Sequence, residues 1–532
     1  MASSGRGRVD QAVPLVSSTR LDSLTDRLTA SGSTTREITA PATGEPLGTI
    51  PESTPKDVAE AVSTAREVQA GWADVPVGTR AQLIEQFADR VLDRREEFLD
   101  VLQAETGKSR QTALEELLDI QSTCEYVAAN GPATIAEESR SPAIRWLSTA
   151  TVTYEPVGVV GVISPWNYPL NLAMVDAIPA LLAGNAVVLK PDEKTPYGAL
   201  LLAELLEAAG LPEGLFQVVA GDGETVGGAL IDHVGYVSFT GGTETGRKVA
   251  ERAGRNLIDC SLELGGNNPL IVLDDADIEQ AARGAVGACF PNMGQLCLSA
   301  ERLYVEKSVY EALLEAFISE TEKLTLGVEH SFNSDLGSLI DEAQLTTVAA
   351  HVDDACTRGA TVRTGGRARP DVGPYCYEPT ILTDVAPDSR VACEETFGPV
   401  VSVTPVDSEA EAIERANDSP YGLNASVWTG ETARGERVAR QIECGTVCVN
   451  DGFAVGWSAT DAPMGGVGAS GIGRRHGPEG IKRYTEPRTI AVSRVGPLGL
   501  PDRLPTSWVM AGFVGVTRLR RRMKRAIRSV RE

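Results

Sequence analysis

Four short segments of the chain carry residue types that could do chemistry together. They contain an asparagine, glutamates and a cysteine. The asparagine side chain can donate hydrogen bonds, a glutamate can accept or donate a proton, and the cysteine thiolate is a nucleophile. The segments are Ser164-Pro-Trp-Asn-Tyr-Pro169, Leu262-Glu-Leu-Gly-Gly266, Gly294-Gln-Leu-Cys297 and Glu394-Glu-Thr-Phe-Gly-Pro399.

A fifth segment, Phe239-Thr-Gly-Gly-Thr-Glu-Thr-Gly246, is a candidate phosphate-binding turn. It runs from a predicted strand into a predicted helix, whose N-terminus offers unpaired N–H groups and the positive end of the helix dipole. Gly241 and Gly246 match the outer glycines of the dinucleotide fingerprint, but Thr243 stands at the middle one. A simple tight turn is the alternative interpretation.

Metal chemistry has little support in the sequence. The four histidines, at 233, 330, 351 and 476, are isolated, and no Cys-x-x-Cys pair occurs. A hydrolase with a Cys–His pair or a Ser–His–Asp triad would need one of these histidines as its base. Spacing does not exclude that arrangement, but none of the four lies in an apparent active-site loop. We therefore expect no metal site.

The elements that must position these segments alternate between strands and helices. Apolar runs at 159–164, 186–190, 216–221, 236–241 and 270–274 alternate with helical periodicity at 172–183, 198–210, 224–231, 245–255 and 277–288. This alternation predicts a parallel, doubly wound sheet. Such sheets bind ligands at the carboxyl ends of their strands, so the loops 164–169, 190–194 and 241–246 should hold the chemistry.

Other stretches surround this sheet. Residues 55–130 have helical periodicity, and a second α/β stretch over about 300–465 has strands near 302–305, 400–404, 425–429 and 445–450. Two further strands, 148–154 and 489–492, should lie outside both sheets.

With these motifs the chain resembles the NAD(P)-dependent aldehyde dehydrogenase superfamily over roughly 35–495. Further matching motifs are Lys190-Pro191, Asn417-Asp418, Tyr421-Gly-Leu423, Pro463-Met-Gly-Gly466 and Ser470-Gly-Ile-Gly-Arg474. The resemblance implies an α/β aldehyde dehydrogenase-like fold, with two doubly wound Rossmann-like domains plus an oligomerisation arm.

The resemblance also implies domain boundaries. We expect a disordered lead-in at 1–34, an NAD-binding domain from 35–141 and 157–265, and a catalytic domain at 266–465. Oligomerisation or interface segments should comprise 142–156 and 466–495, followed by a basic C-terminal tail at 496–532. Arg474 and Glu486 match a family pair that ties the catalytic domain to the subunit interface, so a homodimer or homotetramer is expected.

The catalytic roles follow the family. Cys297 would attack the aldehyde as a thiolate, so that a hydride can leave the resulting hemiacetal. The Asn167 side-chain amide and the Cys297 backbone N–H would bind the oxyanion. Glu263 would then deprotonate the water that hydrolyses the thioester, and partial burial would raise its pKa into a useful range.

The cofactor roles are likewise implied by the resemblance. Trp166, Gly241, Gly242 and Leu264 would line the dinucleotide, Glu395 would hold the nicotinamide ribose and Phe397 would lie against the ring.

Lys190 and Glu193 resemble the pair that contacts the adenosine ribose. The Glu193 carboxylate would repel the extra 2′-phosphate of NADP, and Lys190 would offset part of that repulsion. NAD is therefore the expected cofactor, with NADP as the alternative.

The substrate is the open question. Overall, the chain looks most like succinate-semialdehyde dehydrogenases, but Val175 and Pro291 align with the arginines that bind the substrate carboxylate in that group. Succinate semialdehyde could instead bind through Ser458, backbone N–H groups or Arg302. Otherwise an apolar entrance with Phe453 and Trp457 would take uncharged aliphatic or aromatic aldehydes.

Two rival functions remain. In a CoA-acylating dehydrogenase, CoA would resolve the thioester, and the water-activating Glu263 would be unnecessary. In a non-catalytic binding protein on this scaffold, the set of Cys297, Glu263 and Asn167 would have no role.

The composition excludes several classes. Of 532 residues, 42% are hydrophobic, and 49 Lys+Arg oppose 73 Asp+Glu for a net charge of −24. Global disorder, a membrane-spanning protein, a disulfide scaffold and a nucleic-acid binder all fit poorly. Only nine basic residues are Lys. A halophilic surface and an acidic protein from a GC-rich genome both explain this balance.

The ends of the chain carry further signals. No apolar signal segment is visible near the start, and the cysteines are irregularly spaced, so a cytoplasmic location is expected. In the tail, the apolar run 508–516 precedes eight basic residues between Arg518 and Arg531. A basic amphipathic helix on an anionic membrane is one interpretation, and a solvated or oligomer-packed tail is the other.

Overall fold

The computed structural model describes residues 16–142, 147–494 and 505–528. It divides into two compact units, which are described separately. The larger unit takes in the chain up to Ile135 and then Glu155–Glu486, and the smaller takes in Ala136–Tyr154 and the chain from Pro487 onward.

The first sheet of the larger unit is parallel except at one edge. Its order is β19 (Gly471–Ile472), β9 (Asp259–Glu263), β8 (Tyr236–Thr240), β5 (Val159–Ile163), β6 (Ala186–Lys190) and β7 (Phe216–Val218). Only β19 runs antiparallel to its neighbour. Every residue of β5, β6 and β8 is buried. Burial on both faces explains why these strands are mainly apolar and do not alternate between apolar and polar residues.

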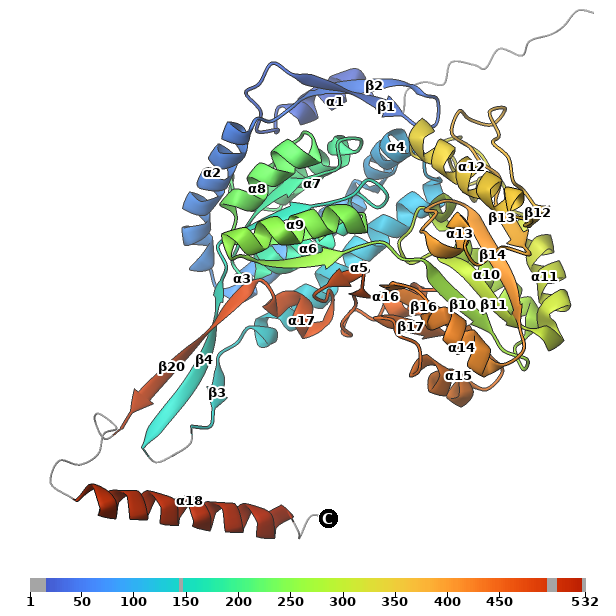
Figure 1. The fold of residues 1–532 in the computed structure, drawn as a ribbon. Helices are drawn as coiled ribbons and strands as arrows, with labels where there is room; N and C mark the ends of the chain where they lie inside the picture. The colour runs from blue at the N-terminus through green and yellow to red at the C-terminus, as the bar shows by residue number, and fades with distance from the viewer. Residues whose placement is uncertain (1–15, 143–146, 495–504, 529–532) are drawn as a thin grey trace, which may run out of the picture. The chain divides into compact units, whose positions relative to one another are not determined.

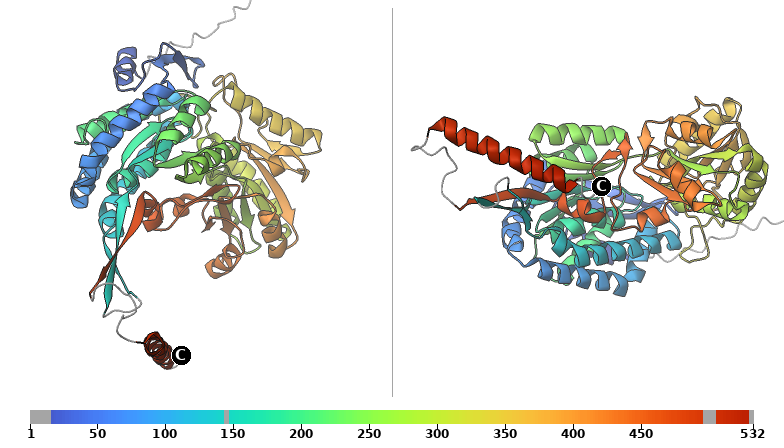
Figure 2. Two further views of the ribbon diagram at one scale, coloured as in Figure 1. Left: turned by 60° about the vertical axis from the view of Figure 1, so that its left-hand side comes forward. Right: turned by 90° about the horizontal axis from the view of Figure 1, so that it is seen from below.

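Helices cross over between these strands and cover them. The crossovers are α6 (Asn171–Leu182), α7 (Pro196–Ala208), η1 (Gly223–Gly227) with α8 (Gly228–His233), and α9 (Thr243–Asn256). Four earlier helices, blue to cyan in Figures 1 and 2, are α2 (Pro55–Ala73), α3 (Val77–Asp93), α4 (Arg95–Thr106) and α5 (Arg110–Thr134). Trp72 of α2 donates from Nε1 to the Leu181 carbonyl at 2.9 Å, which fixes α2 against the end of α6.

The second sheet has helices on both faces. Its order is β12 (Thr361–Thr364), β13 (Thr380–Thr383), β14 (Val400–Val406), β11 (Ala300–Glu306), β10 (Asn268–Val272), β16 (Asn424–Trp428) and β17 (Thr446–Val449). Alternate residues of β10 enter different cores. Leu270 packs with α10 (Ile278–Cys289), α11 (Lys307–Thr321) and α12 (Glu342–Thr357), whereas Ile271 packs with α14 (Glu409–Asn417) and α15 (Thr432–Ala439). Two layers of helices therefore enclose the sheet, as expected for a doubly wound domain.

Short elements complete the larger unit. They are η2 (Pro291–Gly294), α13 (Arg390–Cys393), β15 (Tyr421–Gly422), α16 (Ala454–Trp457), β18 (Val467–Gly468) and α17 (Gly477–Lys482). The segment 466–484, which we predicted as part of the interface segments, thus packs within the larger unit, where β19 pairs with β9.

The predicted disordered lead-in at 1–34 is wrong where the structure describes it. Helix α1 spans Ser18–Thr25, and the Ser17 hydroxyl accepts from the Arg20 N–H at its start. Leu21 and Leu24 are buried in the core of the first sheet, and Arg20 forms ion pairs with Glu97 and Glu204. These contacts join elements far apart in the sequence, so local polarity hid the helix. Residues 1–15 lie outside the described residues.

The smaller unit contains a three-stranded sheet and a helix. The sheet order is β20 (Thr485–Ser493), β4 (Ser148–Pro156) and β3 (Glu138–Arg140), which confirms the predicted strands at 148–154 and 489–492. Helix α18 spans Thr506–Arg528 in the predicted basic tail. Across the described parts of both units, no helix combines the length and apolar character that crossing a membrane requires.

Candidate active site

The predicted active-site loops meet because their strands end at one edge of the first sheet. Ile163 at the end of β5 pairs with Lys190 of β6 and with Phe239 of β8, and Thr240 pairs with Glu263 at the end of β9. The carboxyl ends of adjacent parallel strands are where open α/β sheets bind ligands. The loops that follow these strands therefore open onto a common cleft.

Nine of the eleven predicted site residues line one cavity of about 190 Å³ at this edge. The nine are Asn167, Glu263, Cys297, Trp166, Gly241, Gly242, Leu264, Glu395 and Phe397, and the lining also includes Pro165, Thr240 and Gly265. The remaining two predicted residues, Lys190 and Glu193, do not line this cavity. They lie at and just beyond the end of β6, on the same edge of the sheet.

Cys297 follows a tightly wound loop. Asn292, Met293 and Gly294 adopt left-handed conformations, with φ of 51°, 62° and 69°. A Cβ on Gly294 would lie 2.0 Å from the Gly398 carbonyl oxygen, so only glycine fits there. The Asn268 side chain donates to the Cys297 carbonyl at 2.7 Å and fixes the backbone.

The Cys297 thiol is electrostatically disfavoured as a thiolate. Burial raises its pKa to about 12, and the carboxyl groups of Glu395 and Glu263 add to the rise. Without a further cationic or basic partner, the side chain is a neutral thiol at pH 7. Activation of this nucleophile therefore requires a proton acceptor.

Asn167 is held rigidly beside Cys297. Its side-chain amide donates to the Gln295 carbonyl at 3.0 Å, which leaves the second amide hydrogen for another acceptor. Its own carbonyl accepts from Lys108 Nζ at 2.7 Å, and Lys108 forms a fully buried ion pair with Glu116. Sequence reasoning missed this supporting pair, which lies about fifty to sixty residues before Asn167 and has no motif of its own.

Glu263 is buried with neither carboxylate oxygen hydrogen-bonded within the described structure. Burial raises its pKa to about 7, while Arg475 and Arg483 partly oppose the rise. Arg475 is itself paired with Asp176 at 2.7 Å, so it does not neutralise Glu263 by contact. A carboxyl group in this state can take up or release a proton near neutral pH.

The glycine turn after β8 leaves room for a phosphate. Gly242 is the N-cap of α9 and makes no side-chain capping bond, so the first N–H groups of the helix are available. A Cβ on Gly242 would meet nothing within 4 Å, so the backbone faces open space. The Thr243 hydroxyl donates to the Ala469 carbonyl at 3.0 Å. Thr243 at the middle fingerprint position is therefore compatible with a bound pyrophosphate.

Glu395 and Phe397 line the same cavity as that turn. The Glu395 carboxylate accepts from the Gly266 N–H at 2.9 Å, and burial raises its pKa to about 7. Phe397 has a φ of 52°, stabilised because Glu301 accepts from its N–H at 2.9 Å. The rings of Phe397 and Trp166 meet edge to face at 5.5 Å. An aromatic wall, a buried carboxylate and a helix N-terminus with available N–H groups together fit a nicotinamide dinucleotide.

Glu193, predicted to contact the adenosine ribose, has a cationic partner that the sequence analysis missed. Arg36 of β1 (Thr35–Ala40), which pairs with β2 (Glu45–Pro51), forms ion pairs with Glu193 at 3.0 Å and Glu52 at 2.6 Å. Lys190 is buried, and its Nζ donates to the Pro191 carbonyl at 2.9 Å. Burial lowers the Lys190 pKa, although neighbouring carboxylates oppose this.

A second cavity, of about 50 Å³, is also lined by Cys297. Its lining is Glu115, Asp119, Tyr168, Asn171, Leu172, Leu296, Cys297, Leu298, Phe453 and Trp457. Phe453 and Trp457 line it as the sequence suggested, and Ser458 is not part of the lining. The lining contains two carboxyl side chains and no Lys or Arg. Burial raises the Asp119 pKa to about 7, and a hydrogen bond from Trp457 opposes the rise.

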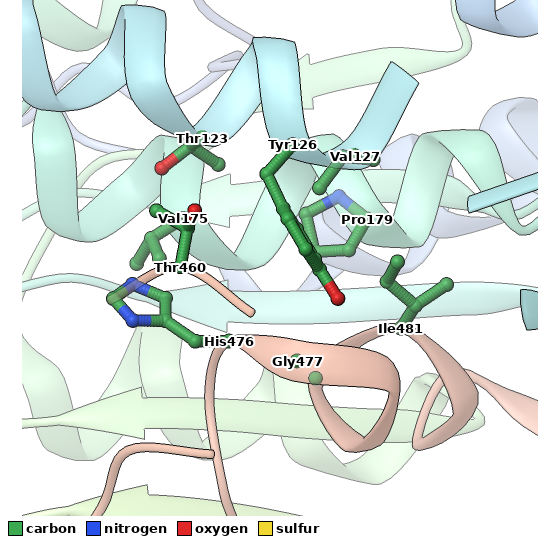
Figure 3. A pocket seen from close by; sticks show the side chains of 10 residues that line it. Thr123, Tyr126, Val127, Val175, Pro179, Thr460, His476, Gly477 and Ile481 are labelled. Carbon is green, nitrogen blue, oxygen red and sulfur yellow. The ribbon is translucent and has the colours of Figure 1, made fainter. Parts of the chain in front are cut away.

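Arg302, the suggested cationic anchor for a substrate carboxylate, does not line this pocket. Arg302 is buried in β11, where it donates to the carbonyls of Asn267, Arg415 and Ala416. Val175 lines a different, smaller cavity with Tyr126 and His476, shown in Figure 3. The suggestion that Arg302 binds the substrate is therefore wrong.

Comparison with known proteins agrees with this geometry. The family model described as "Aldehyde dehydrogenase family" matches residues 28–490. The chain belongs to the aldehyde dehydrogenase family. Members of the family oxidise aldehydes to carboxylic acids with NAD(P)+, so the enzyme is an oxidoreductase with the predicted α/β fold of two Rossmann-like domains.

The enzyme has similar relatives and solved structures. It is 51% identical over 475 residues, 89% of this chain and 92% of the relative, to a Mycobacterium tuberculosis protein named "Putative succinate-semialdehyde dehydrogenase (NADP(+)) 2". An Escherichia coli structure described as an NADP dependent enzyme has a TM-score of 0.84 at 35% identity, covering 88% of this chain and 96% of that one. Betaine aldehyde dehydrogenase from Staphylococcus aureus in complex with NAD+ has a TM-score of 0.85 at 32% identity, covering 91% and 98%.

Two further predictions, the pairing of Arg474 with Glu486 and the expectation of no metal site, concern parts of the enzyme outside the cleft. Arg474 donates to the carbonyls of Gly466 and Gly473, and among the described residues no ion pair joins it to Glu486 in the same chain. Within residues 16–142, 147–494 and 505–528, no group of three or more His, Cys, Asp and Glu side chains is placed to hold a metal ion.

Proposed function

We propose that Cys297 is the nucleophile with which the enzyme oxidises a short aldehyde to its carboxylic acid. The observation that carries the proposal is the convergence of Cys297, Asn167 and Glu263 on one cavity with the cofactor-binding residues. When bound, NAD(P)+ supplies the hydride acceptor. The residues fitted to hold it are Trp166, Gly241, Gly242, Leu264, Glu395 and Phe397.

The chain's own residues carry the covalent steps. The Cys297 thiol releases its proton to solvent as its sulfur adds to the aldehyde carbon, and the resulting oxyanion accepts hydrogen bonds from the free Asn167 amide hydrogen and the Cys297 N–H. After oxidation to the thioester, Glu263 removes a proton from water, and the resulting hydroxide displaces the Cys297 sulfur. The unpartnered Glu263 oxygens and its pKa of about 7 support this role.

Glu263 also favours hydrolysis over the rival functions. A CoA-acylating enzyme has no need of a buried, titratable carboxylate beside the thiol, and neither has a binding protein. Acyl-CoA formation in place of free acid would support the first rival.

For the cofactor we propose use of both NAD+ and NADP+. The Glu193 carboxylate by itself would repel the 2′-phosphate of NADP+ and so favour NAD+. The Arg36 ion pair supports the broader assignment because it offsets the Glu193 charge. Lys190 supplies a second cation at the same end.

For the substrate we propose succinate semialdehyde, because the relatives are named for it. We expect the KM for this substrate to be high. The acidic lining of the second cavity favours a second candidate, an uncharged aldehyde of similar length. Burying a carboxylate without a cationic partner is costly, and Asp119 and Glu115 add like charge.

We further propose a cytoplasmic homodimer or homotetramer. All nine cysteines are free thiols in the described structure. Strand β20 is exposed along nearly its whole length, with Ile490 and Val492 about half exposed. A three-stranded arm without a core of its own gains stability by packing against a second copy.

The test is the Cys297→Ala variant assayed with succinate semialdehyde and with a neutral aldehyde of equal length. Dehydrogenase and esterase activities should both vanish, because both need the same thiolate. Cys356→Ala, at an exposed cysteine, is the matched control and should retain full activity. Near-normal oxidation by Cys297→Ala would refute the covalent mechanism.

A further inference from the structure

Helix α18 has an unusual division of charge. Its 23 residues, Thr506–Arg528, include seven basic and no acidic side chains, and all seven lie from Arg518 onward. The 73 acidic residues of the chain all lie elsewhere. The helix therefore has an uncharged first half and a cationic second half in an otherwise acidic protein.

The cationic half of the helix is divided into two faces, whereas the first half is apolar on all sides and also exposes Met510, Phe513 and Val514. Trp508, Val516, Leu519 and Met523 recur at spacings of eight, three and four residues, which places them on one side of an α-helix. By the same geometry Arg521 and Arg525 fall on the opposite side, whereas Arg518 lies between the two sides and Arg522 borders the apolar face. The apolar face is uncovered, with exposed fractions of 75% for Trp508, 63% for Val516, 61% for Leu519 and 58% for Met523.

We propose that α18 binds the surface of an anionic lipid bilayer. An apolar face with a Trp near one end and a cationic opposite face is the arrangement that lies in a membrane interface. The apolar side chains enter the acyl boundary while the arginines contact anionic headgroups, each contributing to attraction near the surface. A nucleic acid would satisfy the arginines but would leave the apolar face in water.

The test uses the full-length enzyme and cosedimentation with vesicles. Vesicles of equal parts phosphatidylcholine and phosphatidylglycerol should pellet the enzyme, and phosphatidylcholine vesicles should not. Replacing the four arginines (R518Q, R521Q, R522Q, R525Q) should lower partitioning by on the order of a hundredfold. Leu519→Ser with Met523→Ser should also lower it at least tenfold, because both faces contribute.

The matched control replaces four exposed arginines of the larger unit by glutamine, at 247, 255, 367 and 440. It makes the same change in net charge and should bind anionic vesicles like the wild type. All variants should keep the wild-type rate with a soluble aldehyde, which shows that they are folded. Equal binding to both vesicle types, or no loss in the four-arginine variant, would overturn the proposal. So would an α18 deletion that changes only the oligomeric mass, since the occupant would then be a second copy.

Discussion

Arg36 Nη2 lies 3.0 Å from Glu193 Oε2, although the two residues come from segments more than 150 positions apart. The hairpin β1–β2 thus places the Arg36 guanidinium beside the loop after β6, where the adenosine ribose is expected. The charge of Glu193 alone predicts strong rejection of a 2′-phosphate. The ion pair of Arg36 with Glu193 predicts weaker rejection of the 2′-phosphate, because the two charges largely cancel.

Arg36→Gln should therefore select against NADP+. We expect its kcat/KM for NADP+ to fall at least tenfold, while the value for NAD+ changes less than threefold. The reason is that Glu193 then faces the 2′-phosphate uncompensated, at a cost of about 1–4 kcal/mol for like charges near 4 Å. Steady-state kinetics with both cofactors measure the ratio, and Arg255→Gln is the control. If the ratio of the two kcat/KM values is unchanged, Arg36 has no part in the choice between NAD+ and NADP+.

Glu263 should give the turnover a pH dependence near neutrality. Burial raises its pKa to about 7, and a general base works only when deprotonated, so kcat should rise as the pH increases from 6 to 8. Glu263→Gln should lower kcat by about 10²–10⁴ and flatten the rise. Glu251→Gln, at an exposed position further along α9, should keep the wild-type profile. The same rise in Glu263→Gln would assign the titration to another group.

Asp119 should make the KM for succinate semialdehyde depend on pH. Its pKa is raised to about 7, so it becomes negative between pH 6 and 8 beside an aldehyde that carries a distal carboxylate. We expect this KM to rise about tenfold over that range, from like-charge repulsion, while the KM of a neutral aldehyde stays constant.

Asp119→Asn should abolish the rise, and Asp353→Asn at an exposed site should not. At pH 8 the neutral aldehyde should match or exceed succinate semialdehyde in kcat/KM. A hundredfold preference for succinate semialdehyde, insensitive to pH, would mean that a cationic anchor binds its carboxylate.

Salt should stabilise the enzyme. At a net charge of −24, self-repulsion destabilises the folded chain and its contacts with other copies, and salt screens that repulsion. One molar KCl should raise the melting temperature and preserve the oligomer against dissociation on dilution. Equal stability and assembly in dilute buffer would leave the acidic composition without this explanation.

The two sheets were predictable because their strands are buried on both faces. Strands β5, β6 and β8 read as mainly apolar runs, and stretches with helical periodicity separate them. Helix α1 was not predictable from local sequence. Its two buried leucines stand among polar residues, and their burial depends on packing against distant elements, α7 among them.

The candidate site also contains residues that the sequence predicts and residues that it does not. Cys297, Glu263 and Asn167 lie in recognisable motifs, so nine site residues could be placed in one cavity in advance. Lys108 with Glu116, Arg36 and Asp119 could not be found, because each reaches the site from an element distant in sequence. Their roles depend on tertiary contacts rather than on spacing along the chain.

The central claim is that a thioester forms on Cys297 and is released through Glu263. Rapid quenching of the Glu263→Gln variant with aldehyde and NAD+, followed by mass spectrometry of its peptides, tests it most directly. We expect one acyl group per active site, located on Cys297, together with one equivalent of NADH. NADH formed without an acyl adduct, or an adduct on another residue, would contradict it.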